Sequence, residues 1–251
     1  MWWPILLTAG LVIAFLLRWR WYGIDWYSFL ILYGARIYSR FLHRWTSNVW
    51  MAPFPDTGPF LVISNHTCSA DPAFLLAACK RPMSFLVARE HYDVHWLIRN
   101  LLNHLSCIKV ARGGHDPGAL RKSIRRLQEG MPVCLFPEGG LSGVPKNRIL
   151  HAKPGIAFLA LVTRAPVFPI YISGGPRTAQ LLNSWIMPTP QAVHVNFGKA
   201  IDLTAYYDRP LTRALIEEVT GVIMDHVRAL GPVRRNNPPR PSGRGKQRPA
   251  P

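Results

Sequence analysis

Short runs of strand-forming residues alternate with helical patterns through the middle of the 251-residue chain. The strand candidates are Phe60–Ser64, Ser84–Ala88, Cys107–Ala111, Met131–Phe136, Val167–Tyr171 and Ala192–Phe197. Helices are expected at residues 72–79 and 117–129, and a long amphipathic helix at 211–230 ends the series. Strands separated by helices need crossover connections, so the sequence predicts an α/β fold with a mixed, largely parallel sheet flanked by helices. Sites in such sheets gather at the loops that leave the carboxyl ends of the strands.

The first fifty residues are apolar and aromatic, and arginines follow each apolar stretch. The uncharged run from Trp2 to Leu17 would be about 24 Å long as a helix, against roughly 30 Å for a hydrocarbon core. A second apolar segment covers Ile24 to Tyr38, and tryptophans among arginines are typical of a membrane interface. We therefore expect residues 1–50 to form a membrane-engaged helical hairpin, or one short transmembrane helix with its basic side in the cytoplasm. The alternative is a pair of buried core helices.

The last twenty residues have a composition that cannot build a hydrophobic core. Residues 232–251 hold six basic residues and no acidic one, with many prolines and glycines. We expect this segment to be a disordered basic tail, which leaves residues 51–231 as the folded domain. The formal charge of the whole chain is +17, so the folded part is also basic and suits an anionic surface, either membrane or nucleic acid.

The loop after the first strand candidate carries a histidine and an aspartate, His66 and Asp71. If the loop folds back, the carboxylate can accept a hydrogen bond from one ring nitrogen of His66, which fixes the tautomer. The other ring nitrogen is then free to act as a base. The alternative is that Asp71 only caps the helix that starts at Pro72, although one carboxylate can do both.

A second loop, Phe136–Gly143, also follows a strand directly. Its adjacent glycines, Gly139 and Gly140, allow the backbone to approach a ligand closely, and Glu138 can accept hydrogen bonds from hydroxyl groups. Taken alone, the segment could equally be a plain turn with a solvated glutamate.

Together the two loops resemble the motifs of the glycerolphosphate acyltransferase superfamily, whose best-known branch is the 1-acylglycerol-3-phosphate acyltransferases. The pattern HxxxxD of His66 and Asp71 is followed about seventy residues later by FPEG at Phe136–Gly139. Weaker blocks of the family occur in the same order at Ile108–Arg112, Lys153–Gly155 and Val167–Ile170. The resemblance extends over about residues 58–200.

The resemblance implies a membrane-associated O-acyltransferase of phospholipid biosynthesis. His66, oriented by Asp71, would take the proton of a lysophospholipid hydroxyl as it attacks an acyl thioester, either acyl-CoA or acyl carrier protein. The expected acceptor is 1-acylglycerol-3-phosphate. The residues implied in substrate binding are Arg112 for the phosphate, Glu138, Gly139 and Gly140 for the polar head, and Lys153. No metal and no cofactor beyond the thioester co-substrate are expected. The expected place is the cytoplasmic face of a membrane, the inner membrane in a bacterium.

The loop departs from the family pattern after FPEG. Gly140 and Leu141 stand where many relatives have threonine and arginine, which removes a bidentate phosphate ligand. An acceptor other than lysophosphatidic acid, including one without a phosphate, therefore stays open.

Three other interpretations have some support in the sequence. A basic nucleic-acid-binding protein would explain the net charge and the cluster at residues 121–126, but no zinc-finger, RNP-like or helix-turn-helix pattern accompanies them. His91 and His95 have the spacing of metal ligands on a helix, without a third ligand nearby in sequence. Cys68 lies in the first loop, where it could be a nucleophile with His66. The apolar N-terminal segment favours lipid over nucleic acid.

Overall fold

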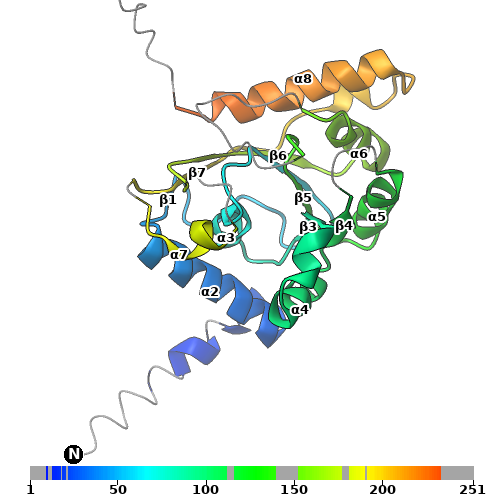
Figure 1. Ribbon diagram of the computed structural model, residues 1–251. Helices are drawn as coiled ribbons and strands as arrows, with labels where there is room; N and C mark the ends of the chain where they lie inside the picture. The colour runs from blue at the N-terminus through cyan, green and yellow to red at the C-terminus, as the bar shows by residue number, and fades with distance from the viewer. Residues whose placement is uncertain are drawn as a thin grey trace, which may run out of the picture.

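The computed structural model describes residues 10, 13–17, 19–20, 22–111, 116–139, 152–176, 181–189 and 191–232. Within these residues, seven strands form one sheet with helices on both faces (Figure 1). The strands are β1 (Thr46–Ser47), β2 (Leu61–Ser64), β3 (Ser84–Ala88), β4 (Ile108–Val110), β5 (Val133–Leu135), β6 (Val167–Ser173) and β7 (His194–Phe197). The helices are α2 (Trp26–Leu42), α3 (Asp71–Leu76), α4 (Trp96–His104), α5 (Pro117–Gln128), α6 (Gly155–Thr163), α7 (Leu181–Ile186) and α8 (Arg213–Ala229), with short 3₁₀ turns η1 (Arg89–Asp93) and η2 (Thr204–Tyr206).

The sheet has the strand order β1-β7-β6-β2-β5-β3-β4. Every neighbouring pair is parallel except β6 and β7, which are antiparallel. The predicted mixed, largely parallel sheet is thus confirmed. Strand β2 lies between β5 and β6, with Leu61 opposite both Val133 and Val167. Because these three strands are parallel, the loops that leave their carboxyl ends meet at one edge of the sheet.

Two hydrophobic cores cover the two faces of the sheet. In β2, Val62 packs into the core that holds residues of α2 and α3, while Leu61 and Ile63 pack into the core that holds residues of α5, α6 and α8. A strand buried on both faces reads as a continuous apolar run, as Leu61–Ser64 does. The α2 side and the α5 side of the sheet are therefore separate layers.

The N-terminal segment packs against α2. Residues 13–17 are helical, and the ring of Phe15 lies 5.1 Å from that of Phe29 and 6.0 Å from that of Tyr33. On its inner face, α2 buries Phe29 and Leu32 in the same core as Phe74 of α3. These contacts agree with a helical hairpin, although residues 1–9 and the tail from residue 233 lie outside the described residues. The division of the chain at residue 50 stays a prediction.

Among the helices in the described parts of the chain, none combines the length and the apolar character that crossing a membrane requires. The transmembrane helix that the sequence suggested as one alternative is therefore not found there.

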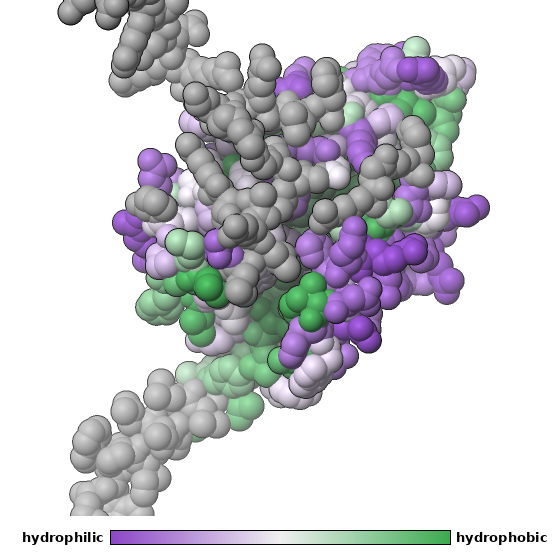
Figure 2. Space-filling view, viewed as in Figure 1, coloured by the Kyte–Doolittle hydropathy of each residue, from purple (hydrophilic) through white to green (hydrophobic). Residues whose placement is uncertain are grey.

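Large exposed apolar side chains gather on the α2 side of the molecule. Figure 2 shows hydrophobic surface over α2 and α4. The residues are Ile13, Leu17, Trp26, Leu30, Ile37, Phe41, Trp50, Val94, Trp96, Leu97, Ile186 and Met187, called the apolar face below. On the opposite layer, the comparable side chains among the described residues are Val162 and Leu211. A contiguous exposed apolar surface marks a place where a protein or a membrane is contacted.

Candidate active site

The loop after β2 folds back so that His66 and Asp71 lie together. Nδ1 of His66 is 2.8 Å from Oδ2 of Asp71. The Asp71 side chain is fully buried, whereas 16% of the His66 side chain is exposed. The carboxylate therefore holds the imidazole from inside the protein while the ring keeps an exposed part.

Asp71 faces the loop and does not cap its own helix. Its carboxylate accepts hydrogen bonds from the backbone N–H groups of Thr67 and Cys68, the hydroxyl of Thr67 and the thiol of Cys68. All of these groups precede α3, so the interpretation of Asp71 as a helix cap alone is wrong. A carboxylate can only accept, so the proton of the His66–Asp71 hydrogen bond belongs on Nδ1 of His66. This tautomer leaves Nε2 as the acceptor nitrogen.

The loop after β5 meets the first loop directly. The ring of Phe136 stacks on that of His66, with centroids 4.1 Å apart and planes 16° apart. The backbone N–H of His66 donates to Oε1 of Glu138 at 3.4 Å. Two residues of the FPEG motif thus fix the position of His66, one by its ring and one by its carboxylate.

Gly139 turns the second loop and brings Lys153 beside it. Its φ of 68° favours glycine, and a Cβ atom there would lie 2.6 Å from Nζ of Lys153. The N–H of Lys153 donates to the carbonyl of Pro137 at 2.9 Å. The structure thus brings Glu138, Gly139 and Lys153 together at one turn. Arg112 and Gly140, the other residues expected in the site, lie outside the described residues.

The segment after β6, which begins at Gly174 and Gly175, also contacts the first loop, although its sequence was not predicted to belong to the site. The side chain of Asn65 accepts from the N–H of Ile172 at 2.7 Å and donates to its carbonyl at 2.9 Å. After β6, a Cβ atom on Gly175 would lie 2.6 Å from the hydroxyl of Thr67. The first loop therefore rests on the end of β6. Gly174 and Gly175 are adjacent glycines that follow a strand, as Gly139 and Gly140 do. This pattern could have indicated from the sequence that the segment after β6 also takes part in the site.

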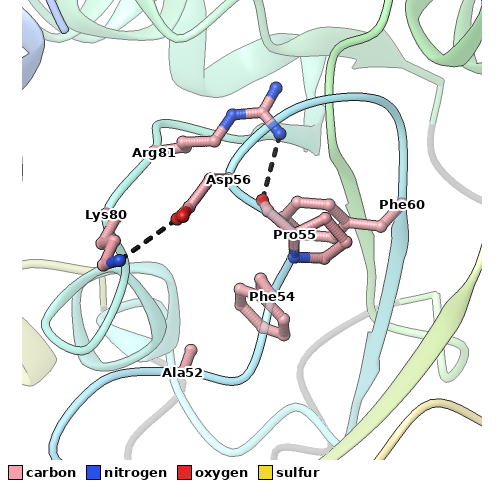
Figure 3. A pocket seen from close by; sticks show the side chains of 7 residues that line it. All are labelled: Ala52, Phe54, Pro55, Asp56, Phe60, Lys80 and Arg81. Atoms are coloured by element: carbon pink, nitrogen blue, oxygen red, sulfur yellow. Dashed lines mark hydrogen bonds and ion pairs between the residues drawn. The ribbon is translucent and has the colours of Figure 1, made fainter. Parts of the chain in front are cut away.

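A separate small hollow lies at the other end of β2 (Figure 3). It is lined by Ala52, Phe54, Pro55, Asp56, Phe60, Lys80 and Arg81. Its volume of about 10 Å³ is room for about one water molecule. The guanidinium group of Arg81 donates to the carbonyls of Pro55, Gly58 and Gly130, which ties three loops together. Phe60 precedes β2 whereas His66 follows it, so this hollow is structural and distinct from the site.

Comparison with known proteins identifies the family to which these loops belong. A family model described as Acyltransferase matches residues 49–173, a range that contains both loops. A probable 1-acyl-sn-glycerol-3-phosphate acyltransferase of Mycoplasma genitalium is 27% identical over an alignment of 123 residues, and the alignment covers 46% of this chain and 44% of that protein. The chain belongs to the glycerolphosphate acyltransferase superfamily. The family resemblance inferred from the HxxxxD and FPEG motifs is thereby confirmed.

Two further proteins show how far the likeness extends. Taffazin of Dictyostelium discoideum is 23% identical over an alignment of 184 residues, and the alignment covers 67% of this chain and 62% of that protein. The chain thus spans less than two thirds of the length of either curated relative. The crystal structure of the 1-acyl-sn-glycerophosphate (LPA) acyltransferase PlsC from Thermotoga maritima matches with a TM-score of 0.57 at 19% identity. That match covers 89% of this chain and 87% of the other, and it shows that the two share a fold.

Cys68 is buried in the first loop, beside Asp71. Burial and the neighbouring Asp71 carboxylate raise the pKa of its thiol well above the ordinary value. The thiolate, which is the nucleophilic form, is therefore strongly disfavoured. The nitrogen Nδ1 of His66, moreover, is engaged by Asp71. A Cys68–His66 nucleophilic pair is not supported by this arrangement.

The histidines with metal-ligand spacing lie in two different elements after β3. The side chain of His95 accepts from the N–H of Leu97 at 3.2 Å and thus caps the start of α4. His91 lies in the 3₁₀ turn η1. The two residues therefore belong to different elements, and their four-residue spacing does not place them on one turn of a helix.

Proposed function

We propose that the chain is an O-acyltransferase that moves a fatty acyl group from an acyl thioester to the hydroxyl of a lysophospholipid. The observation that carries this proposal is the His66–Asp71 pair, which leaves Nε2 of His66 as an acceptor on a side chain that is partly exposed. Family membership supports it, because the pair and the FPEG turn both lie in the matched residues.

In the proposed reaction, Nε2 of His66 takes the proton of the acceptor hydroxyl as that oxygen attacks the thioester carbonyl carbon. The resulting tetrahedral species collapses, the carbon–sulfur bond breaks, and the leaving thiolate takes the proton back from the imidazolium. The products are an ester and a free thiol, and His66 returns to its starting state. Asp71 stabilises the imidazolium through the hydrogen bond to Nδ1. A placed base contributes about 10²–10⁴-fold, and holding two reactants together supplies roughly 7–11 kcal/mol.

A phosphate-bearing acceptor suits the positive charge around the second loop. Lys153 lies against Gly139, and Arg112 follows β4, whose carboxyl end is at the same edge of the sheet. We propose 1-acylglycerol-3-phosphate as the acceptor, with Arg112 binding its phosphate and Glu138 lying beside its polar head. Its single free hydroxyl is the one that gives its proton to His66. Gly140 and the backbone beside it would approach the same polar head.

Transfer of a labelled acyl group from palmitoyl-CoA to a panel of lysolipids tests this function. We expect 1-acylglycerol-3-phosphate to have the highest kcat/KM. Arg112→Ala should raise the KM for this acceptor at least about tenfold, because a lost charged hydrogen bond costs about 1.5–3 kcal/mol. The KM for palmitoyl-CoA should stay within about twofold. Arg213→Ala on α8, an exposed arginine remote from the loops, is the control. Preference for an acceptor without a phosphate, or an unchanged acceptor KM in Arg112→Ala, would contradict the assignment.

We also propose that the apolar face lies on a membrane, at its cytoplasmic side (the inner membrane in a bacterium). Along α2, Trp26, Leu30, Ile37 and Phe41 recur at helical spacing with their side chains exposed. Aromatic side chains flanked by arginine are typical of the level of lipid headgroups. An enzyme docked in this way would reach its lipid acceptor without extracting it into water.

Flotation with lipid vesicles measures this contact. The full-length protein should float with vesicles of phosphatidylcholine and phosphatidylglycerol, and Trp26→Glu/Phe41→Glu should lose most of that binding, because burying two charges in the interface is costly. Val162→Glu/Leu211→Glu is the matched control, with apolar side chains of about half exposure on the opposite layer. Equal flotation of the two double variants would rule out the α2 side as the contact.

A further inference from the structure

Helix α7 lies against the first loop, which carries His66 and Asp71. The hydroxyl of Ser184 on α7 is hydrogen-bonded to that of Ser69, which lies between these two residues in the loop. Ser184 is fully buried and Ser69 is half-buried. Figure 1 shows α7 beside α3, the helix that follows the loop. One buried hydroxyl therefore joins α7 to the loop that holds the proposed base.

The first loop is held from two sides. On the inner side, the N–H groups of Thr67 and Cys68 donate to the carboxylate of Asp71, and Nδ1 of His66 donates to it as well. On the outer side, the hydroxyl of Ser69 bonds to α7. Loss of the outer contact would leave the bonds to the carboxylate intact and loosen the loop toward α7. A catalytic group that is misplaced by about 1 Å can cost about 10²-fold in rate.

The next residue of α7 ties the helix to α2. The hydroxyl of Tyr38 on α2 donates to the carbonyl of Trp185 at 2.9 Å, and the ring centroids of the two residues lie 5.4 Å apart. Because the hydroxyl proton goes to Trp185, Nε2 of the buried His43 donates to the oxygen of Tyr38, at 2.8 Å. Helix α7 therefore connects the first loop with the helix that forms much of the apolar face.

The end of α7 belongs to the apolar face itself. Ile186 is the last residue of the helix and is 58% exposed, and Met187 follows it at 55%. A helix of six residues is too short to be stable in water on its own, so packing must hold it in place. The buried Ser184 and Trp185 supply this packing on the inner side. In water, Ile186 and Met187 add little to it.

Continuity with α2 identifies a lipid surface as the partner of this end of α7. The hydroxyl of Thr189 donates to the carbonyl of His43 at 3.5 Å, and Arg44 donates to the carbonyl of Thr189 at 3.4 Å. These bonds tie the segment after α7 to the end of α2, where Phe41 is 81% exposed. Arginine beside exposed apolar side chains is typical of the level of lipid headgroups. A membrane that contacts α2 would therefore also bury Ile186 and Met187.

We propose that Ser184 is a positioning residue, which fixes the place of His66 through Ser69. Contact of Ile186 and Met187 with the membrane holds α7 against the first loop, so turnover rises when the protein is membrane-bound. This inference rests on the proposed acyl transfer and adds a regulation of the same site. The base is fully positioned only at the surface that supplies the lipid acceptor.

Removal of the Ser184 hydroxyl tests the positioning role. Ser184→Ala should lower kcat for acyl transfer by about tenfold with both KM values within about twofold, because the contact positions the base and binds no substrate. Ser184→Thr keeps a hydroxyl and should recover most of kcat. Ser123→Ala on α5 is the matched control, since this serine is also fully buried and donates to the carbonyl of Ala119 at 2.9 Å. It should lower the melting temperature to a similar extent and leave kcat unchanged.

Ser69→Ala removes the same hydrogen bond from its half-buried end and serves if Ser184→Ala does not fold. Its kcat should also fall by about tenfold. Adding Ser184→Ala to it should lower kcat by less than about twofold more, because two residues that act through one contact are not additive. Two independent losses, or undiminished kcat in either folded single variant, would contradict the positioning role.

Soluble substrates isolate the effect of the membrane on the protein. With hexanoyl-CoA and 1-hexanoylglycerol-3-phosphate, vesicles of phosphatidylcholine and phosphatidylglycerol should raise kcat of the wild type at least about threefold, as α7 shifts toward its docked position. Ile186→Ser/Met187→Ser should lose this rise even with lipid in such excess that all of the protein floats. Val162→Ser/Leu211→Ser, on the opposite layer, should keep it. Equal activation of the two double variants would overturn the role of the membrane contact.

Hydrogen exchange separates failure of the positioning role from failure of the enzymatic function. Vesicles should slow amide exchange in residues 66–71 of the wild type, and Ser184→Ala should speed it at least about threefold, while exchange in α5 stays the same. This readout requires no turnover. A wild type that transfers no acyl group from any thioester would refute the proposed function, whereas unaltered exchange of the loop in Ser184→Ala would overturn the positioning role.

Discussion

His66→Ala should lower kcat for acyl transfer by about 10²–10⁴-fold, the usual contribution of a placed general base. The substitution removes the nitrogen that accepts the hydroxyl proton, while the turn at Gly139 and the acceptor contacts remain. Acceptor and thioester KM should therefore change little, because the lost interaction forms only as the proton moves. Single-turnover measurement of labelled acyl transfer, together with thermal unfolding, checks both parts.

The stack of His66 on Phe136 makes a control for stability necessary. Its loss should cost about 0.5–1.5 kcal/mol of unfolding free energy, which lowers the melting temperature without unfolding the protein. His226→Ala is the matched variant, since this exposed histidine lies on α8 and is hydrogen-bonded to the carbonyl of Val222. Turnover like that of the wild type in folded His66→Ala would remove His66 as the base.

The sequence allowed the strands to be placed because their apolar character is local. Residues 61–64 are apolar apart from their last serine, as a strand buried on both faces requires, and the structure has β2 there. Helix α6 was not predicted, because Gly155–Thr163 is apolar on nearly every side and shows no amphipathic period. Strand β1 was missed as well, since it has two residues and exists through pairing with β7.

Only part of the site was predictable, because motifs are local in the sequence whereas the contacts between loops are not. A motif could indicate that His66 and Asp71 act together, but their contact depends on a loop conformation that spacing does not determine. The stack on Phe136 and the two hydrogen bonds of Asn65 with Ile172 join segments far apart in the chain, so they follow from the register of β2 with β5 and β6. Tertiary pairing of this kind leaves no periodic signal in the sequence.

Substitutions of Asp71 should separate its structural role from its catalytic one. Asp71→Ala removes a fully buried acceptor and leaves several donors of the loop without a partner, so we expect the unfolding free energy to fall by about 3–5 kcal/mol. Asp202→Ala is the matched control, because Asp202 also accepts from the N–H and hydroxyl of a threonine but is exposed. That change should stay within about 0.5–1 kcal/mol. Denaturant unfolding measures both.

Asp71→Asn should keep the fold and still lose turnover. The ring of His66 and the backbone N–H groups of Thr67 and Cys68 all donate to Oδ2, so the oxygen of the new amide should take this position. Its NH₂ group then takes the position of Oδ1, where it faces the hydroxyl of Thr67 and the sulfur of Cys68. Both of those groups can accept a hydrogen bond. The His66 tautomer is then preserved, and only the negative charge opposite the imidazolium is lost. A charged hydrogen bond exceeds a neutral one by about 1–2 kcal/mol, so kcat should fall about 5–30-fold, with KM unchanged. A folded Asp71→Asn protein with undiminished kcat would show that the carboxylate positions His66 without stabilising its charge.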